Sequence, residues 1–275
     1  MRTQRVRALL TVCLFALVPS LALAQQAAPP AADESADLAK KLANPISDLV
    51  SVPMQFNWEQ NVGPNEQTRF ILNVQPVMPF ALNKDWNLIA RVIMPLVSQP
   101  ALFEGGSPAF GVSDIFTSFF FSPSGGGLTW GVGPAISLPS TTIPTLGTEK
   151  WSAGPTAVVL KQTGNWTYGA LFNQVWSFSG NRDRSDVNQM FLQPFLALQA
   201  TKTLTVTLQS ETAANWEVSE GRWTVPINVL LSKLSTFGVF PASYQVGVGG
   251  FPVHPDGGPS WKVRGAIVIL LPNRR

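Results

Sequence analysis

The chain has 275 residues, enough for one large domain or two small ones, and carries 19 Lys and Arg against 16 Asp and Glu. Three of the basic residues lie within the first seven positions, in a leader without acidic residues, so 16 residues of each sign remain beyond it. The basic excess therefore does not indicate a nucleic-acid-binding surface, and no nucleic-acid partner is expected. Charged residues make up only 13% of the chain, about half the usual share, which suits a protein surface that faces lipid.

Residues 1–24 have the features of a secretory signal peptide: basic residues, an apolar core and a cleavage site. The apolar core, Ala8 to Val18, is too short to cross about 30 Å of hydrocarbon as a helix, so we predict cleavage rather than a membrane anchor. Ala22-Leu23-Ala24 supplies small residues where a signal peptidase reads them, which places the cut before Gln25. Cys13, the one cysteine of the chain, lies inside this leader, so the mature chain is expected to have no disulfide.

The segment 25–48 is predicted to be a linker followed by a short amphipathic periplasmic helix. The linker is rich in Pro, Ala and Gln, and the helix is expected over Asp33 to Ala43, with Ser35 as its N-cap and Asn44-Pro45 ending it. Two interpretations stay open at this point. The segment either sits in the periplasmic mouth or partly plugs the lumen of the domain that follows, or it is a mobile tail.

From residue 49 to 272 the chain alternates apolar and polar residues, which predicts an all-β domain. Residues 115–148 contain no charge, but their many Gly and Pro residues exclude a membrane-spanning helix. Only helices and closed barrels satisfy every backbone group in lipid, so we predict a transmembrane antiparallel β-barrel in the outer membrane. A soluble β-sandwich shows the same alternation, so this pattern alone does not decide between the two.

About twelve strands are expected, and the gaps between them alternate between short and long. Bacterial barrels have short periplasmic turns and longer outer loops, whereas a sandwich has no reason to sort its loops in this way. The nine tryptophans also fall near predicted strand ends, as expected at the membrane–water interfaces. The predicted strands lie near residues 50–60, 67–80, 86–97, 110–121, 128–138, 151–160, 166–178, 188–198, 204–216, 222–233, 241–249 and 260–271.

Several stretches, spread over nearly the whole mature chain, carry a family resemblance. They include ANPISDL at 43–49, VQPVMPF at 74–80 and DWNLIAR at 85–91. Shorter matching stretches lie at 111–115, 121–123, 154–158 and 188–195. These stretches resemble a proteobacterial outer-membrane transporter family that is often named for the MetA pathway of phenol degradation, or mislabelled neuromedin U. The resemblance implies a barrel fold, an outer-membrane location and, more weakly, transport.

Charged residues on the polar face of the predicted strands, together with nearby aromatic residues, are candidates for lining the lumen of the barrel. Charges that face a lumen can hold water and set the solute preference, but they can equally pair with one another and stiffen a narrow barrel. Phenylalanines on the same face suit a moderately hydrophobic solute. The candidates are Glu59, Arg69, Arg91, Asp114, Phe191, Phe195, Glu211, Lys262 and Arg264.

Little in the sequence favours catalysis, and we predict no catalytic residue, metal site or cofactor. His254, the one histidine, lies in a turn-forming loop near Ser260, which leaves a lipid-cleaving barrel with a Ser/His pair as the weakest hypothesis. The first hypothesis is a channel or transporter for small solutes, aromatic or hydrophobic ones included. The second is a structural or binding barrel with a filled lumen. The expected partners are outer-membrane lipid, a small-molecule solute and the barrel-assembly machinery.

Overall fold

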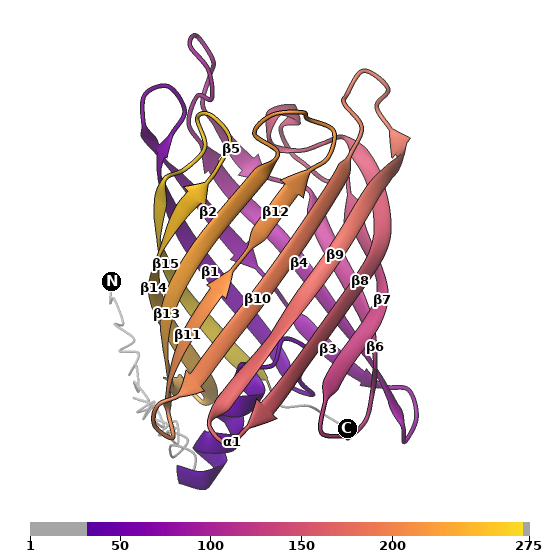
Figure 1. Ribbon diagram of the computed structural model, residues 1–275, viewed down its shortest axis with the longest axis vertical. Helices are drawn as coiled ribbons and strands as arrows, with labels where there is room; N and C mark the ends of the chain where they lie inside the picture. The colour runs from indigo at the N-terminus through magenta and orange to yellow at the C-terminus, as the bar shows by residue number, and fades with distance from the viewer. Residues whose placement is uncertain (1–31, 272–275) are drawn as a thin grey trace, which may run out of the picture.

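A computed structural model describes residues 32–271, in which antiparallel strands form one closed barrel (Figure 1). Its 15 strands make a wall of 12, because three strands of the wall are each interrupted once. The wall closes where the last strand pairs with the first, from Val50 opposite Leu271 to Gln60 opposite Trp261. No helix among residues 32–271 has the length and hydropathy needed to span a bilayer. The predicted signal peptide and most of the predicted linker lie outside the described residues.

The unbroken strands are β1 (Val50–Val62), β4 (Trp86–Gln99), β7 (Thr129–Leu138), β8 (Lys150–Thr163), β9 (Trp166–Gly180), β10 (Asn188–Gln199), β13 (Trp223–Phe237), β14 (Phe240–Val253) and β15 (Trp261–Leu271). The interrupted strands are β2 (Gln67–Val74) with β3 (Val77–Ala81), β5 (Ala109–Val112) with β6 (Ile115–Pro123), and β11 (Leu204–Ser210) with β12 (Thr212–Asn215). One α-helix, α1 (Ala32–Leu42), and one 3-10 turn, η1 (Pro144–Leu146), complete the described chain.

On β1 and β15, alternation sends apolar side chains outward and polar ones inward. Trp58 and Val263 are 40% and 38% exposed on the outer surface, whereas their neighbours Glu59 and Arg264 are only 7% and 3% exposed. A surface of this kind is stable in lipid, where outward apolar groups need no burial by protein. The fold class and the approximate strand number predicted from the sequence are confirmed.

The two ends of the barrel differ in their connections. Five tight turns, all of five residues or fewer, lie at the end that Figure 1 shows at the bottom, here called the short-turn end. The opposite, long-loop end carries longer connections such as residues 100–108, 139–149 and 254–260. In bacterial barrels short turns face the periplasm and long loops face outward.

Strand β11 is separated from β12 at Glu211, and a proline lies beside this point on each neighbouring strand. The register of β10 continues across the break, because Leu192 pairs with Thr212 and Phe195 pairs with Gln209. Pro194 lies between those pairs, and Pro226 of β13 has the corresponding place on the other side. Proline has no backbone N–H for the ladder, which accounts for the interrupted pairing around Glu211.

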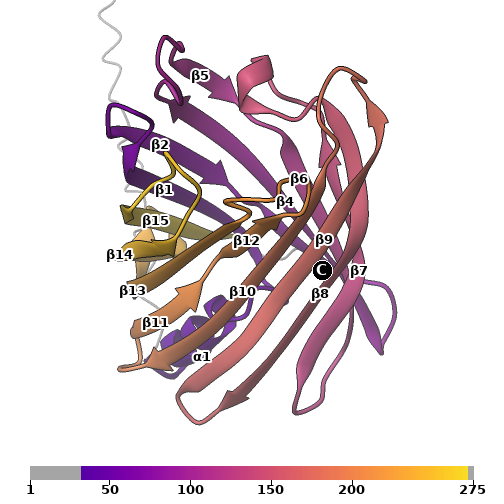
Figure 2. The same ribbon diagram turned by 45° about the horizontal axis from the view of Figure 1, so that its top comes forward.

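Helix α1 occupies the mouth of the barrel at the short-turn end (Figures 1 and 2). Ser35 and Ala39 are buried, and two barrel glutamines donate hydrogen bonds to carbonyl oxygens of the helix. The Nε2 of Gln162 donates to Lys40 at 2.9 Å, and the Nε2 of Gln199 donates to Ala36 at 3.1 Å. Of the two interpretations of this segment, the packing of residues 35–48 agrees with a plug in the mouth rather than with a tail.

The ends of α1 correct one prediction and support another. The helix begins at Ala32, so Ser35 lies within it, and the expected N-cap at Ser35 is wrong. A serine side chain tolerates a helical interior when it is packed, and local burial has overridden its capping preference here. The helix ends at Leu42, just before Asn44, whose Oδ1 accepts a hydrogen bond from the Ile46 N–H at 3.0 Å.

Candidate functional site

The interior of the barrel contains a charged group centred on Glu211. Its carboxylate accepts hydrogen bonds from Arg264 Nη1 at 2.8 Å and Nη2 at 2.6 Å, and from Lys262 Nζ at 3.0 Å. Lys262 and Arg264 are almost fully buried, with 4% and 3% of their side chains exposed. Charges buried to this extent need a close opposite charge, and Glu211 provides it for both Lys262 and Arg264 of β15.

A hydrogen-bonded path continues from this group to the opposite wall. Arg264 Nε donates to Asn57 Oδ1 at 2.7 Å, and the Asn57 side-chain amide donates to Gln55 at 3.4 Å. Gln75 also donates to Gln55 at 3.4 Å, and its own Oε1 accepts from Arg91 Nη2 at 2.7 Å. The path therefore links β15, β1 and the segment between β2 and β3 to β4.

The remaining charged candidates of the strand interior form a separate ion pair. Glu59 and Arg69 face each other on β1 and β2, with an Nη2–Oε2 distance of 2.6 Å and an Nε–Oε2 distance of 2.7 Å. Arg69 also reaches Gln99, at 3.4 Å. With this pair, the six inward-facing charged candidates comprise four cations and two anions, which gives a net charge of +2. These residues are Glu59, Arg69, Arg91, Glu211, Lys262 and Arg264.

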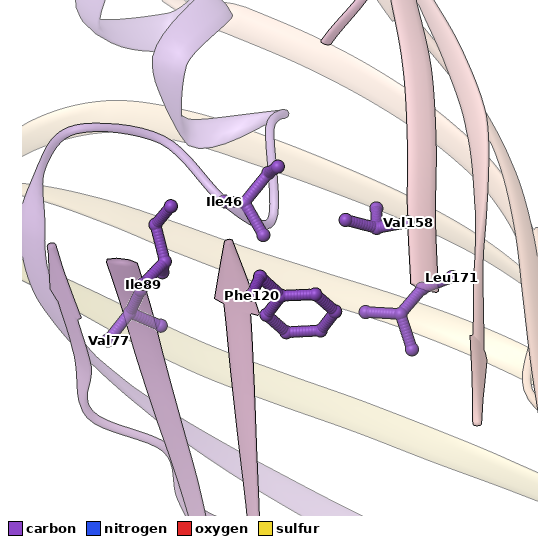
Figure 3. Close-up of a cluster of buried hydrophobic side chains, with 6 residues drawn as sticks. All are labelled: Ile46, Val77, Ile89, Phe120, Val158 and Leu171. Carbon is purple, nitrogen blue, oxygen red and sulfur yellow. The ribbon is translucent and has the colours of Figure 1, made fainter. Parts of the chain in front are cut away.

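The other side of the interior is filled by an apolar cluster that includes the N-terminal segment (Figure 3). Ile46, which is 4% exposed, points from the segment after α1 toward the ring of Phe120, which is completely buried. Val77 and Ile89 lie on one side of this contact, and Val158 and Leu171 lie on the other. Phe191, a predicted lumen residue, packs against the same cluster. This cluster narrows the lumen between the two ends.

Cavities of different size lie inside the barrel formed by residues 32–271. A large one has a volume of about 610 Å³, lies toward the long-loop end, and has both Phe191 and Arg91 in its lining. Two smaller cavities, of about 190 and 120 Å³, adjoin the N-terminal segment and include Leu42 and Pro45 in their lining. Arg91 lines the 120 Å³ cavity as well as the 610 Å³ one, so it lies where the two approach each other.

Two predicted lumen residues have other surroundings. Asp114 lies between β5 and β6, where its carboxylate accepts hydrogen bonds from the backbone N–H and the hydroxyl of Thr148, both at 2.7 Å, and from the Thr141 N–H at 3.3 Å. It thereby fixes the loop 139–149 and takes no part in the charged groups described above. Phe195 lines the 190 Å³ cavity at the short-turn end, apart from Phe191 in the larger cavity.

The loop after β9 is held by an ion pair at the long-loop end. Lys150 Nζ donates to Asp186 Oδ1 at 3.0 Å, and the Ser177 hydroxyl donates to the same oxygen at 3.1 Å. The hydrogen bond from Lys150 lowers the pKa of the Asp186 carboxyl, and the Ser177 bond and the Lys150 charge act in the same direction. Val187, the next residue, is buried and lines the 610 Å³ cavity, so this pair positions part of the cavity wall.

Several interior residues were not among the sequence candidates. Alternation marks Gln55 and Asn57 as inward-facing polar residues, but it does not show that they connect Arg264 to Arg91. Arg222 and Glu220 line the 610 Å³ cavity from a loop, where the alternation of strands does not predict the direction of a side chain. Ile46 also lies outside any strand, and no sequence pattern indicates which barrel residues it contacts.

The Ser/His pair needed by a hydrolase is not formed among residues 32–271. The Oγ of Ser260 is buried without a hydrogen-bond partner, and His254 Nδ1 lies 2.9 Å from the carbonyl oxygen of Pro255. The geometry of this loop therefore gives no support to the lipid-cleaving hypothesis.

No protein-family model and no curated protein matches the chain, so the resemblance to the phenol-pathway family stays a prediction. Solved structures do match. The COG4313 outer membrane channel from Pseudomonas putida F1 aligns with a TM-score of 0.59 and 12% identity, over 81% of this chain and 96% of that one. The NanC porin aligns with a TM-score of 0.52 and 9% identity, over 81% of this chain and 99% of that one.

Outer membrane phospholipase A from Escherichia coli aligns with a TM-score of 0.47 and 13% identity, over 86% of this chain and 98% of that one, a similarity too low to bear on activity. The first two similarities show that the chain has the fold of outer-membrane β-barrels, which supports an outer-membrane location.

Proposed function

We propose that this protein is an outer-membrane channel for small solutes, aromatic and moderately hydrophobic ones included. The observation that carries the proposal is the 610 Å³ cavity inside the barrel, which shares Arg91 with a smaller cavity toward the short-turn end. A cavity of this size holds a small molecule and its water. The described polar path gives the lumen hydrogen-bonding groups that a dehydrated solute can use.

The fold and the lining of the cavity support this proposal. Two solved structures that align with TM-scores of 0.59 and 0.52 are described as a channel and a porin. Phe116 of β6 and Phe191 of β10 both line the large cavity and offer apolar surface to a ring-shaped solute. Passage would be narrowest at the apolar cluster around Ile46.

A second candidate, a binding or structural barrel with a filled lumen, is favoured by the N-terminal segment. Ile46 closes against five inward-facing side chains, and α1 fills part of the mouth. Under this hypothesis the segment does not leave the barrel, and the large cavity is a binding site that opens only at the long-loop end.

Liposome swelling distinguishes the two functions. Purified mature protein is reconstituted and diluted into isosmotic glycine or arabinose, together with a variant that lacks residues 25–48, and heat-dependent electrophoretic mobility confirms that both barrels are folded. Swelling with the intact chain supports the channel. Tight vesicles with the intact chain and swelling with the variant support the filled barrel, and tight vesicles with both overturn the channel proposal. Membrane fractionation of expressing cells tests the outer-membrane location separately.

A further inference from the structure

Arg91 differs from the other inward-facing charged residues of the described chain because no carboxylate forms an ion pair with it. Glu59 is paired with Arg69, and Glu211 is shared by Lys262 and Arg264. Among residues 32–271 no carboxylate lies within 4.0 Å of the Arg91 guanidinium, whose hydrogen bond goes to the neutral Gln75 amide at 2.7 Å. A half-buried guanidinium with free N–H groups binds carboxylates strongly and with defined geometry.

The position of Arg91 gives this charge access to a ligand. It lines the 610 Å³ cavity, whose volume lies within the usual range for small-molecule sites. The same cavity is lined by the aromatic rings of Phe116 and Phe191, with Leu171 and Val175 adding aliphatic surface. The cavity therefore combines one inner cation with an apolar region large enough for an aromatic ring.

The surrounding charges also favour an anion. The net charge of the six inward-facing charged candidates is +2, because four are cationic and two are anionic. At the outer rim of the cavity Arg222 and Glu220 offset each other, and Arg222 is held 5.5 Å from the ring of Trp216. A neutral ligand would leave the Arg91 donors unmatched, and a cationic ligand would be repelled by them.

We propose that the large cavity is a binding site for a small aromatic carboxylate, with Arg91 as the residue that binds its carboxylate group and Phe116 and Phe191 contacting its ring. This deepens the proposed function, on which it rests for the route by which the ligand enters. Gln75 orients the guanidinium by accepting a hydrogen bond from Arg91 Nη2. Arg91 would then select for anions at the junction of the two cavities.

Calorimetric titration of the detergent-purified mature chain tests the site with three probes: benzoate, benzyl alcohol and acetate. Benzoate has both features that the site requires, benzyl alcohol lacks the charge, and acetate lacks the ring. We expect benzoate to bind at least tenfold more tightly than either of the others. Arg91→Gln should weaken benzoate binding roughly tenfold or more, as expected for loss of a charge-assisted hydrogen-bonded pair, and Arg91→Lys should retain part of the affinity.

The matched control is Lys233→Gln, which removes one positive charge from an exposed position on β13 and should leave benzoate binding unchanged. Equal binding of benzoate and benzyl alcohol, an unaltered affinity in Arg91→Gln, or no binding of benzoate would each overturn the proposal. The swelling assay is independent of these results: swelling without benzoate binding leaves the channel standing and removes this site, whereas benzoate binding to a barrel that never leaks keeps the site and removes the channel.

Discussion

Arg264 and Glu211 meet inside the barrel through two parallel hydrogen bonds, although β13 and β14 separate their strands in the wall. The contact is possible because β14 has glycine at the two positions beside the cations of β15. Gly247 pairs with Arg264, and Gly249 pairs with Lys262, so no β14 side chain occupies the space above them. The cations can therefore lie across β14 and reach the carboxylate at the break between β11 and β12.

Glu211→Gln should destabilise the barrel and make its lumen more selective for anions. The substitution leaves Lys262 and Arg264 buried without a carboxylate, and breaking a buried ion pair in this way costs about 3–5 kcal/mol in a dry interior and less where water enters. It also changes the sum of the six interior charges from +2 to +3. Unfolding in denaturant measures the first effect, and the reversal potential of a planar bilayer in a KCl gradient measures the second.

The control for this change is Glu217→Gln, which removes a negative charge from an exposed position in the loop after β12. This variant should match the parent in denaturant midpoint and in reversal potential. If Glu211→Gln matched it on both measurements, the contact between Glu211 and the β15 cations would have no energetic or electrostatic weight.

Glu59 and Arg69 should behave as a coupled pair in a double-mutant cycle. Each single substitution, Glu59→Gln or Arg69→Gln, leaves one charge without its 2.6 Å partner, whereas the double substitution leaves two neutral amides facing each other. We expect a coupling free energy of about 0.5–3 kcal/mol, seen as a double variant more stable than the sum of the single effects. Denaturant unfolding of the four proteins measures it, and simple additivity would contradict the pairing.

The barrel was accessible from the sequence because alternation acts locally. Lipid outside and water or polar groups inside impose the same period on every strand, so the outward side of Trp58 and the inward side of Glu59 can be assigned from their own neighbours. The lengths of the connections then indicate which end of each strand lies at the short-turn end of the barrel. The positions of Trp86 and Trp130, whose rings pack edge to face 5.9 Å apart at the short-turn end, follow from that assignment.

The contacts inside the lumen were not accessible in this way. Alternation along the strands places Glu211 and Arg264 on the inner face. Their contact, however, depends on the closure of the 12-strand barrel and on the absence of a side chain at Gly247. Asp114 has the same local appearance as a lumen charge, yet the loop 139–149 folds back onto it. Ile46 precedes the first strand, and its partners come from five strands that only the closed barrel brings together.

Ile46→Ala should make the barrel more permeable. The substitution removes a side chain that packs against Phe120 and its neighbours, at a cost of about 2 kcal/mol or more for a buried Ile→Ala change. The lost contacts weaken the packing of the N-terminal segment inside the barrel. A loss of about 2 kcal/mol of packing free energy would raise the fraction of molecules in which this segment has left the barrel roughly 30-fold. Liposome swelling rates in arabinose measure the change.

Ile227→Ala provides the comparison, because it removes the same atoms from a half-exposed position on the outer face of β13. Its swelling rate should equal that of the parent. Equal rates in all three proteins would show that the segment around Ile46 does not control passage.

Gly247→Ala should destabilise the barrel far more than Gly250→Ala, three residues further along the same strand. A Cβ at position 247 would lie 2.6 Å from the Val229 carbonyl oxygen and would clash with Leu230 Cδ2, whereas a Cβ at position 250 would have no neighbour within 4 Å. Overpacking of this kind typically costs about 1–3 kcal/mol. Because Gly247 pairs with Arg264, the displaced backbone would also disturb the contact with Glu211, and the denaturant midpoint and the reversal potential should change together in Gly247→Ala alone. A midpoint shift shared by both variants would instead reflect a general intolerance of β14 to side chains, and the space beside Arg264 would have no special role.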